Sequence, residues 1–334
     1  MDKKEIKLDK YDHSILWHLD VNARSSYTDI ARAVRLSKQS VKLRIQRMES
    51  AGVIRGYRTI GNLTSLGYLY CRAHIKFFNT TEAEEETIAH DIGKNQNVNW
   101  VVSTDGPYDL LVGFLGKNEM EIEKLIAGLL NPYRERILDF DFVTVTRVAF
   151  FNRGYWLDKK SPGVKIMVGN KIPYTKQDAM PLEEKDKKIL ALLSENARLP
   201  INKIAREVRL SPEAVSYKIK KFEKNGLICK YFLLLDYKKV GTHLYKALLY
   251  LKPLDEAREK ELTAFIAMNP YVFDYTRTLA PWQMEIDFEA KDQDHCHQII
   301  VELVDRFKDV IKDHQTLYIL KEHKFLYCPL LQES

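Results

Sequence analysis

The stretch Asn22-Ala23-Arg24 recurs as Asn196-Ala197-Arg198, and the two copies are 174 positions apart (196 − 22). The same offset maps Val34-Arg35-Leu36-Ser37 onto Val208-Arg209-Leu210-Ser211 without a gap. It also relates Val41 to Val215, Ile45 to Ile219, Glu49 to Glu223, Gly67 to Gly241 and Pro107 to Pro281. An internal duplication of this length sets the domain plan before any helix or strand is assigned. It further predicts a pseudo-twofold molecule, the symmetry that a palindromic DNA site selects.

The composition is that of an ordinary globular protein that is mildly basic. The chain has 334 residues, of which 45% are hydrophobic and 29% charged, and its net charge is +6. This charge permits a nucleic-acid partner without demanding one, so the location of the basic residues matters more than their sum. The four cysteines are widely spaced and form no Cys-x-x-Cys pair, which predicts reduced thiols. The chain starts without a signal peptide and has no apolar stretch of about 18 residues, so we expect a cytoplasmic protein with no membrane partner.

The first copy begins with a pattern of three helices. Apolar residues share one helical face over residues 8–20, and a second short helix fits residues 28–34. Ser37 is a good N-cap for a third helix, which Gly52 ends. Residues 53–58 then alternate like a short strand pair, which predicts a β-wing. Because the second copy repeats the pattern, with Ser211 as cap and Pro212 at the first helical position, we predict two winged helix-turn-helix units.

A different pattern follows each helical unit. From Tyr68 to Val148 the order is strand, helix, strand, strand, helix, strand, and it repeats from Leu244 to Phe325. That order is typical of the ferredoxin-like βαββαβ fold. The predicted fold is therefore α+β, with two tandem copies of a winged helix-turn-helix plus a ferredoxin-like domain. The expected boundaries are 1–62 and 63–150 for the first copy, 151–180 for a connector with a candidate short strand at Val164 to Val168, and 181–237 and 238–334 for the second copy.

The third helix of the first copy carries polar and basic side chains suited to DNA. A helix that enters the major groove needs donors for base edges at its N-terminus, with basic residues beside it for phosphates. Lys38 and Gln39 suit the bases, whereas Arg44 and Arg47 suit the phosphates. The candidates are Arg32, Lys38, Gln39, Ser40, Lys42, Arg44 and Arg47, with Arg58 on the wing. A merely solvated basic face is the alternative, but the turn, the cap, the apolar spacing and the wing together favour DNA binding.

The matching helix of the second copy is less suited to DNA. Pro212 and Glu213 replace Lys38 and Gln39, and a carboxylate repels phosphate although it can accept a hydrogen bond from cytosine. This unit either reads a different half-site, which we favour, or has become structural. Its candidate DNA contacts are Ser216, Tyr217, Lys218 and Lys221.

The residues that carry these patterns resemble the Lrp/AsnC (feast/famine) family of transcription regulators, in a tandem double-length version. The matching residues are Asp12, Ile15-Leu16, Asn22-Ala23-Arg24, Ile30-Ala31, Leu36-Ser37, Val41, Arg44-Ile45, Glu49, Gly52-Val53-Ile54, Gly56-Tyr57 and Leu66-Gly67. The resemblance covers nearly the whole chain. It implies a sequence-specific transcription regulator whose winged helix binds double-stranded DNA and whose sheet domain dimerises and often binds an amino acid.

In this family the amino acid lies near the turn between the second and third strands of the sheet domain. Here that turn runs from Thr104 to Asp109, and Gly106, Tyr108 and Asp109 match the family's Gly-x-Tyr-Asp motif. Gly106 would let a backbone approach the effector, and Asp109 would pair with its ammonium group. A tight turn with a capping carboxylate is the alternative. The second copy lacks both the glycine and the aspartate, so we expect no such site there.

The duplication predicts that the two sheet domains pair within one chain, replacing the usual homodimer, although further homo-oligomers stay open. Such pairing would bury apolar residues such as Leu111, Val112 and Phe114. We expect no cofactor other than an amino-acid effector, no metal and no catalytic residue. The run Asp294-His295-Cys296-His297 reads as a helix start, because consecutive helical residues point about 100° apart and do not converge on one ion.

Two other functions compete with transcription regulation. Fused halves of this kind also resemble sirohaem decarboxylases, which are enzymes that hold a tetrapyrrole on the same fold. Candidate contacts with its carboxylates are His243, Arg277 and Arg147, which are scattered in the sequence. That reading would leave the basic third helix unexplained. A protein–protein adaptor with a vestigial DNA module is the other alternative.

Overall fold

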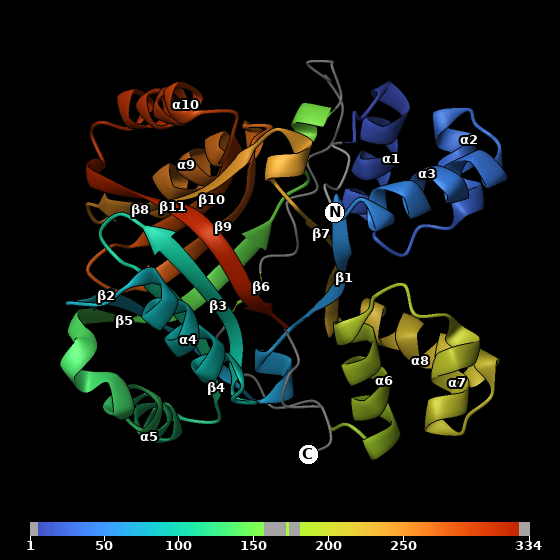
Figure 1. The fold of residues 1–334 in the computed structure, drawn as a ribbon, viewed down its shortest axis with the longest axis horizontal. Coiled ribbons are helices and arrows are strands. Elements are labelled where there is room, and N and C mark those ends of the chain that lie inside the picture. Colours follow the sequence, from blue (N-terminus) through green and yellow to red (C-terminus); the bar gives the residue numbers. More distant parts are fainter. Residues whose placement is uncertain (1–5, 157–171, 174–180, 327–334) are drawn as a thin grey trace.

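A computed structural model describes residues 6–156, 172–173 and 181–326. The candidate strand at Val164 to Val168 and Cys328 lie outside these residues. Two helical units form one side of the molecule, and a large sheet with four helices forms the other (Figure 1). The first unit comprises α1 (Lys10–Val21), α2 (Tyr27–Val34) and α3 (Lys38–Ser50), and the second comprises α6 (Glu184–Glu195), α7 (Ile201–Val208) and α8 (Pro212–Lys224). Short 3-10 turns occupy Thr64–Leu66, Asn131–Arg136, Gly154–Trp156 and Lys238–Val240.

The predicted caps start the helices of both units. The Ser37 side chain accepts from the backbone of Ser40 at the start of α3, and Ser211 accepts from Ala214 at the start of α8. The turn before each of these helices contains an arginine in the left-handed conformation, with φ of 56° at Arg35 and 53° at Arg209. Local sequence therefore sets both helix-turn-helix corners in the same way.

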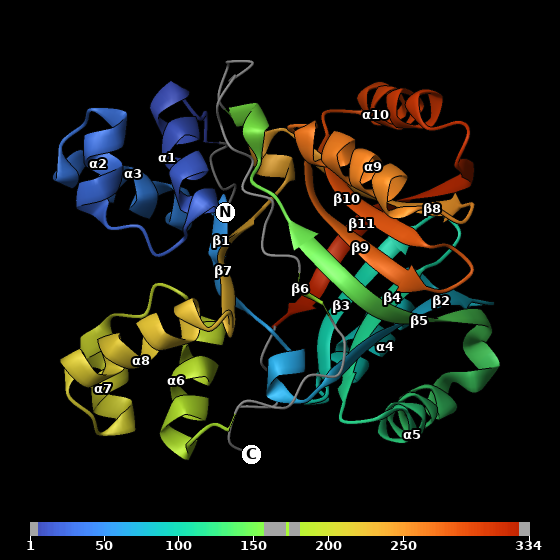
Figure 2. The same ribbon diagram turned by 180° about the vertical axis from the view of Figure 1, so that it is seen from behind.

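The wing prediction is wrong in one respect, because neither unit forms its own strand pair. Strand β1 (Ile54–Gly61) pairs instead with β7 (Ile228–Leu235) of the other copy, antiparallel and with Tyr57 opposite Leu233. A short isolated hairpin is only marginally stable, whereas pairing across the copies lets both strands lie over the two helical cores. The strand pair thus joins the two helical units into one body (Figures 1 and 2).

Each sheet domain has the predicted βαββαβ order. The first consists of β2 (Leu69–Phe77), α4 (Glu82–Gly93), β3 (Val98–Asp105), β4 (Leu110–Gly116), α5 (Glu119–Leu130) and β5 (Ile137–Phe150). The second consists of β8 (His243–Leu251), α9 (Glu256–Met268), β9 (Val272–Leu279), β10 (Met284–Ala290), α10 (Gln293–Arg306) and β11 (Ile311–Phe325). Their strand orders, β5-β2-β4-β3 and β11-β8-β10-β9, are equivalent. The fold prediction of two tandem winged helix-turn-helix plus ferredoxin-like units is confirmed.

The two sheets close on each other through their edge strands. Strand β3 pairs with β11, and β5 pairs with β9, so eight strands form one antiparallel ring, to whose edge the two-residue β6 (Ile172–Pro173) adds. The helices cover the outside of this ring (Figure 2). Leu111 lies inside the ring, as expected for pairing between the copies, whereas Val112 and Phe114 lie beneath the helices of their own copy. Because the copies pair, each of these eight strands has a hydrogen-bonded neighbour on both sides, and no strand edge is left entirely unpaired.

Candidate nucleic-acid interface

The repeated Asn-Ala-Arg motif joins the two helical units in a reciprocal contact, which we call the clasp (Asn22–Arg24 and Asn196–Arg198). The Arg198 guanidinium donates to the carbonyls of Ala23, at 2.6 Å, and Ser25, at 3.0 Å. The Arg24 guanidinium donates in the same way to the carbonyls of Ala197 and Leu199. Because each arginine satisfies carbonyls of the other copy, the clasp fixes how the two units are oriented.

The strand pair completes the clasp. The backbone N–H of Ala23 donates to the Tyr231 carbonyl, and that of Ala197 donates to the Tyr57 carbonyl at 3.0 Å. Arg24 lies over the ring of Tyr231, and Arg198 over that of Tyr57. Burial also lowers the pKa of Arg24. The sequence revealed the repeat, but not that its arginines bind across the pseudo-twofold axis.

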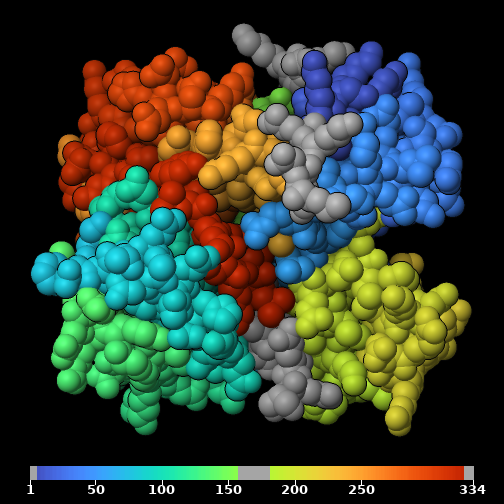
Figure 3. Space-filling model, viewed as in Figure 1, coloured from blue at the N-terminus to red at the C-terminus, as the bar shows by residue number. Residues whose placement is uncertain are grey.

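The exposed face of α3 presents several predicted DNA contacts to solvent. Lys38, Gln39 and Lys42 are exposed, and Ser40 is half-buried at the first turn of the helix. The Arg32 guanidinium is exposed as well and lies 3.7 Å from the Asp29 carboxylate. Both helical units lie at the surface on the same side of the molecule (Figure 3). The face that carries the N-terminal residues of α3 is therefore not covered by the described part of the chain.

Two arginines of α3 bind the protein itself. The Arg44 and Arg47 guanidiniums bind the fully buried Asp12 carboxylate, at 2.9 and 2.5 Å, and Arg44 also binds Asp9 at 2.9 Å. Burial by itself lowers the pKa of Arg44, but these hydrogen bonds outweigh it and raise the pKa above its ordinary value. Arg47 stays 48% exposed. These two residues thus anchor α3 to the start of α1, and any phosphate they contact must compete with Asp12.

Arg58 is placed differently from the other candidates of the first copy. It lies on β1 and donates to the carbonyls of Glu195 and, at 3.2 Å, Phe325. Burial lowers its pKa. Since the local wing is replaced by the β1–β7 pair, Arg58 is half-buried against these carbonyls rather than on an exposed hairpin.

The exposed face of α8 has different chemistry. Pro212 and Glu213 are exposed at the positions of Lys38 and Gln39, and Lys221 is also exposed. Lys218 binds Asp186 at 2.7 Å, which repeats the anchoring of Arg44, while Ser216 is half-buried. Tyr217 is 70% exposed, and its equivalent in α3, Leu43, is 55% exposed. Leu43 was not among the predicted DNA contacts. An apolar residue on the outward face of a basic helix can indicate contact with a thymine methyl group, so its position was a usable signal.

The candidate effector turn is tightly bonded within the protein. The Asp109 carboxylate accepts from Lys76 Nζ at 2.6 Å and from the backbone N–H of Phe77 at 2.7 Å. Gly106 has φ of +133°, and a Cβ there would lie 3.0 Å from the carbonyl oxygen of Thr316. The Tyr108 hydroxyl donates to Asp141 at 2.5 Å. The glycine is thus required where the turn meets β11 of the other copy.

The candidate tetrapyrrole contacts are not brought together. Arg147 and Arg277 both lie near the Glu259 carboxylate of α9, at 3.2 and 3.6 Å, on the helix-covered side of the sheet. His243 on β8 is paired with Ala290, the last residue of β10. Arg277 on β9 is paired with Met284, the first residue of β10. Six residues along a strand separate two groups by about 20 Å. The three side chains therefore do not face one ligand.

No helix of the described residues is long and apolar enough to cross a bilayer.

Within residues 6–156, 172–173 and 181–326, no three His, Cys, Asp or Glu side chains are grouped to hold a metal ion. In the Asp294–His297 run, Cys296 is buried and the His295 ring packs edge-on against Tyr271 at 4.3 Å.

Comparisons with known proteins agree with the duplication. A winged helix-turn-helix DNA-binding family model matches residues 8–55 and again 182–228. The HTH-type transcriptional regulator LysM of Sulfurisphaera tokodaii is 30% identical over 143 residues, which cover 43% of this chain and 98% of that protein. An uncharacterized HTH-type transcriptional regulator of Pyrococcus abyssi is 26% identical over 143 residues, covering 43% of this chain and 93% of that protein. Each of these relatives thus corresponds to about one copy.

Among solved structures, those of NirDL match both copies together. The siroheme decarboxylase NirDL superposes with a TM-score of 0.59 at 16% sequence identity, and the match covers 97% of each chain. At this identity the likeness concerns the fold alone.

Proposed function

Because the chain belongs to the Lrp/AsnC family of helix-turn-helix proteins, in a tandem double-length form, we propose that it is a sequence-specific DNA-binding transcription regulator. The clasp carries this proposal, since it holds two helix-turn-helix units in one fixed orientation within a single chain. Each unit exposes the face of its third helix. One chain therefore does what two chains do in a homodimeric regulator, and it acts in the cytoplasm beside the DNA.

The operator should be asymmetric, because the two helix faces differ. Lys38 and Gln39 offer donors in the first unit, whereas Pro212 and Glu213 offer no side-chain donor in the second. A glutamate accepts a hydrogen bond from the amino group of cytosine, and glutamine reads adenine. We therefore expect two unlike half-sites rather than a palindrome.

Replacing Arg32 and Lys42, both exposed, together with alanine tests the phosphate contacts. We expect weaker binding to specific and non-specific DNA alike, by about 10-fold, and a salt dependence that is less steep by about two units in a plot of log K against log salt concentration. Fluorescence anisotropy with labelled duplexes at several salt concentrations measures both quantities. The matched control removes two exposed lysines of the sheet domain, Lys117→Ala with Lys124→Ala. Equal behaviour of the two double variants would argue against DNA contact by α3.

Replacing Gln39 with alanine tests base reading in one half-site. We expect discrimination against substituted bases at one position to fall by about 1–3 kcal/mol, while binding to non-specific DNA changes little. Competition with duplexes that carry single base changes gives this quantity for each position. A uniform loss of affinity at all positions would contradict a base contact by Gln39.

A tetrapyrrole-modifying enzyme is the second candidate, since NirDL shares the fold. Two observations favour the regulator: the separation of His243 from the arginine pair, and a ring interior whose cavity of about 40 Å³ is lined by carboxyl groups. Acidic walls repel the carboxylates of a tetrapyrrole. We expect no change in the visible spectrum of sirohaem when the protein is added, and a stable shift would favour the enzyme.

An amino-acid effector stays part of the proposal, at the turn that Gly106, Tyr108 and Asp109 form. Asp109 is already bound to Lys76, so an effector ammonium group would have to displace this lysine. The expected contact is therefore weaker than one with a free carboxylate.

A further inference from the structure

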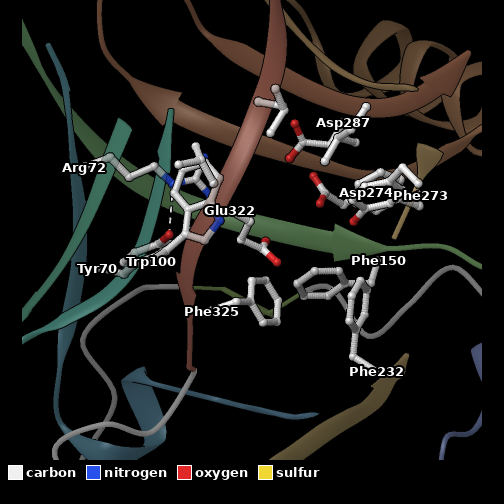
Figure 4. A pocket seen from close by; sticks show the side chains of 14 residues that line it. Tyr70, Arg72, Trp100, Phe150, Phe232, Phe273, Asp274, Asp287, Glu322 and Phe325 are labelled. Atoms are coloured by element: carbon white, nitrogen blue, oxygen red, sulfur yellow. Dashed lines mark hydrogen bonds between the residues drawn. The ribbon is translucent and has the colours of Figure 1, made fainter. Parts of the chain in front are cut away.

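A small polar cavity lies inside the strand ring, apart from the helical units and the effector turn (Figure 4). Its volume is about 40 Å³. Three carboxyl groups line it, from Asp274 on β9, Asp287 on β10 and Glu322 on β11. Figure 4 shows that these three groups point toward a common space. Arg72 also lines the cavity, and the remaining walls are largely aromatic: Trp100, Phe150, Phe232, Tyr237, Phe273 and Phe325.

Arg72 and Lys246, two cations beside these carboxyl groups, are both bound by carboxylates. Arg72 binds Glu285 at 2.5 Å. Lys246 is fully buried and binds Glu285 at 3.0 Å and Asp287 at 2.8 Å. The two cations thus bind Glu285 and Asp287. Neither cation forms an ion pair with the other two carboxyl groups, those of Asp274 and Glu322. Beside this cavity the carboxyl groups of Asp274, Glu285, Asp287 and Glu322 thus outnumber Arg72 and Lys246, with Arg55 at the rim.

Asp274 is the acid with the poorest partner. Its side chain belongs to a residue that is 7% exposed, and within the described residues it forms no ion pair. The group hydrogen-bonded to it is another carboxyl, that of Asp287. Burial raises the pKa of Asp274 well above its ordinary value, and Asp287 raises it further, while the positive charges of Lys246 and Arg72 act on it in the opposite direction and lower its pKa. Two facing carboxyl groups share a proton or bind a cation, and of these two only Asp287 has a bound cation, Lys246.

Glu322 completes the acidic wall. Burial raises its pKa to about 7, against the opposing influence of Arg55, whose guanidinium is 3.9 Å away at the rim. A hydrogen bond with Trp100 also lowers the pKa, and near neutral pH the Glu322 side chain carries a charge for part of the time. The cavity thus offers carboxyl oxygens from three strands and aromatic faces, the combination that binds organic ammonium ions.

The duplication shows that these acids are not a general requirement of the fold. Subtraction of the 174 offset maps Asp274 onto Trp100, Asp287 onto Gly113 and Glu322 onto Val148. The first copy therefore builds the same positions without a carboxylate. A buried acid without a bound cation, such as Asp274, destabilises a protein, so its presence in one copy needs another explanation.

We propose that this cavity binds the ammonium group of a small primary amine, one per chain, between Asp274, Asp287 and Glu322. A water needs about 10–15 Å³ in the same measure, so the space suits an ammonium group with one or two carbons. A bound ammonium neutralises the acidic excess and donates three hydrogen bonds to the three carboxyl groups. Because the ring joins both copies, such a ligand stabilises the pairing that orients the helical units.

Thermal unfolding with methylammonium chloride tests this site, with potassium chloride at equal ionic strength as reference. We expect a saturable rise of the melting temperature with methylammonium that potassium does not give. Tetramethylammonium, which has no N–H donor and is larger, should have no effect. Ammonium chloride separates a site for the bare ion from one for an amine, since we expect methylammonium to bind more tightly. Equal shifts with all four salts, no saturation, or tighter binding of ammonium than of methylammonium would overturn the proposal.

Variants locate the binding in the cavity. Asp274→Asn should fold, because the amide has nearly the size of the protonated carboxyl group, and should weaken methylammonium binding at least 10-fold in isothermal titration calorimetry. Glu322→Gln provides a second test from another strand, and Asp294→Asn, an exposed carboxylate on α10, is the matched control. In the unmodified protein, titrations in buffers of different ionisation enthalpy should show proton release on binding. Binding that is unchanged in both cavity variants, or that releases no proton, would contradict the proposal and leave a water-filled cavity.

Discussion

Replacing both clasp arginines, Arg24→Ala with Arg198→Ala, is expected to weaken binding to a complete operator by about 100-fold. The clasp keeps the two helical units in one orientation, so both bind DNA as a single rigid body. Without it, each unit keeps its own DNA face, but the second binding event loses its preset geometry. Tethered binding sites commonly gain 10²–10⁴ in affinity from such geometry, and this gain is what the variant should lose.

Half-site DNA separates this effect from a direct contact. The affinity of the double variant for a duplex with one half-site should stay within about twofold of the unmodified protein, because neither arginine is proposed to touch DNA. Arg134→Ala with Arg306→Ala removes two exposed arginines of the sheet domains and serves as the matched control. An equal loss on half-site and full-site DNA would mean that the clasp arginines contact the phosphates themselves.

Replacing Lys246 with methionine is expected to destabilise the protein by about 3–5 kcal/mol, because it removes one partner from a buried ion cluster. Lys246 is fully buried, and the change leaves Glu285 with Arg72, the Trp282 indole N–H and His74 as partners, and Asp287 without the lysine. Urea unfolding, followed through the fluorescence of the buried Trp282, gives the change in stability.

A compensating change tests whether charge is the cause. Adding Asp287→Leu to Lys246→Met should restore at least 1 kcal/mol, since an apolar pair of similar volume replaces the orphaned acid. A loss of less than 1 kcal/mol in the single variant, or no recovery in the double variant, would contradict this role of the cluster.

Local patterns in the sequence predicted most of the elements. Ser37 and Ser211 begin their helices as predicted, and the βαββαβ order is found in both copies. These features depend on residues close together in the chain, whose caps and periodicity are visible in one stretch. The β1–β7 pair was not predicted, because a short alternating segment does not say which strand will be its partner.

The burial of the acidic residues of β10 could not be predicted from the sequence, for a different reason. Glu285, Asp287 and Glu289 alternate with apolar residues along β10, a pattern that ordinarily places the polar side in water. Closure of the ring covers that side, so all three become buried. The partners of Arg44 and Arg58 in the candidate interface were likewise not predictable. The sequence does not show that buried Asp12 binds Arg44, or that a backbone carbonyl binds Arg58.

The affinity of the purified chain for a promoter fragment, recovered by genome-wide footprinting, tests the account most directly when it is measured between 50 and 200 mM salt. Two helical units that together contact six to ten phosphates should lose about 10³–10⁵ in affinity over this range, with one chain bound per fragment. Retention of no fragment, or an affinity that does not change with salt, would contradict DNA binding by the two exposed helix faces.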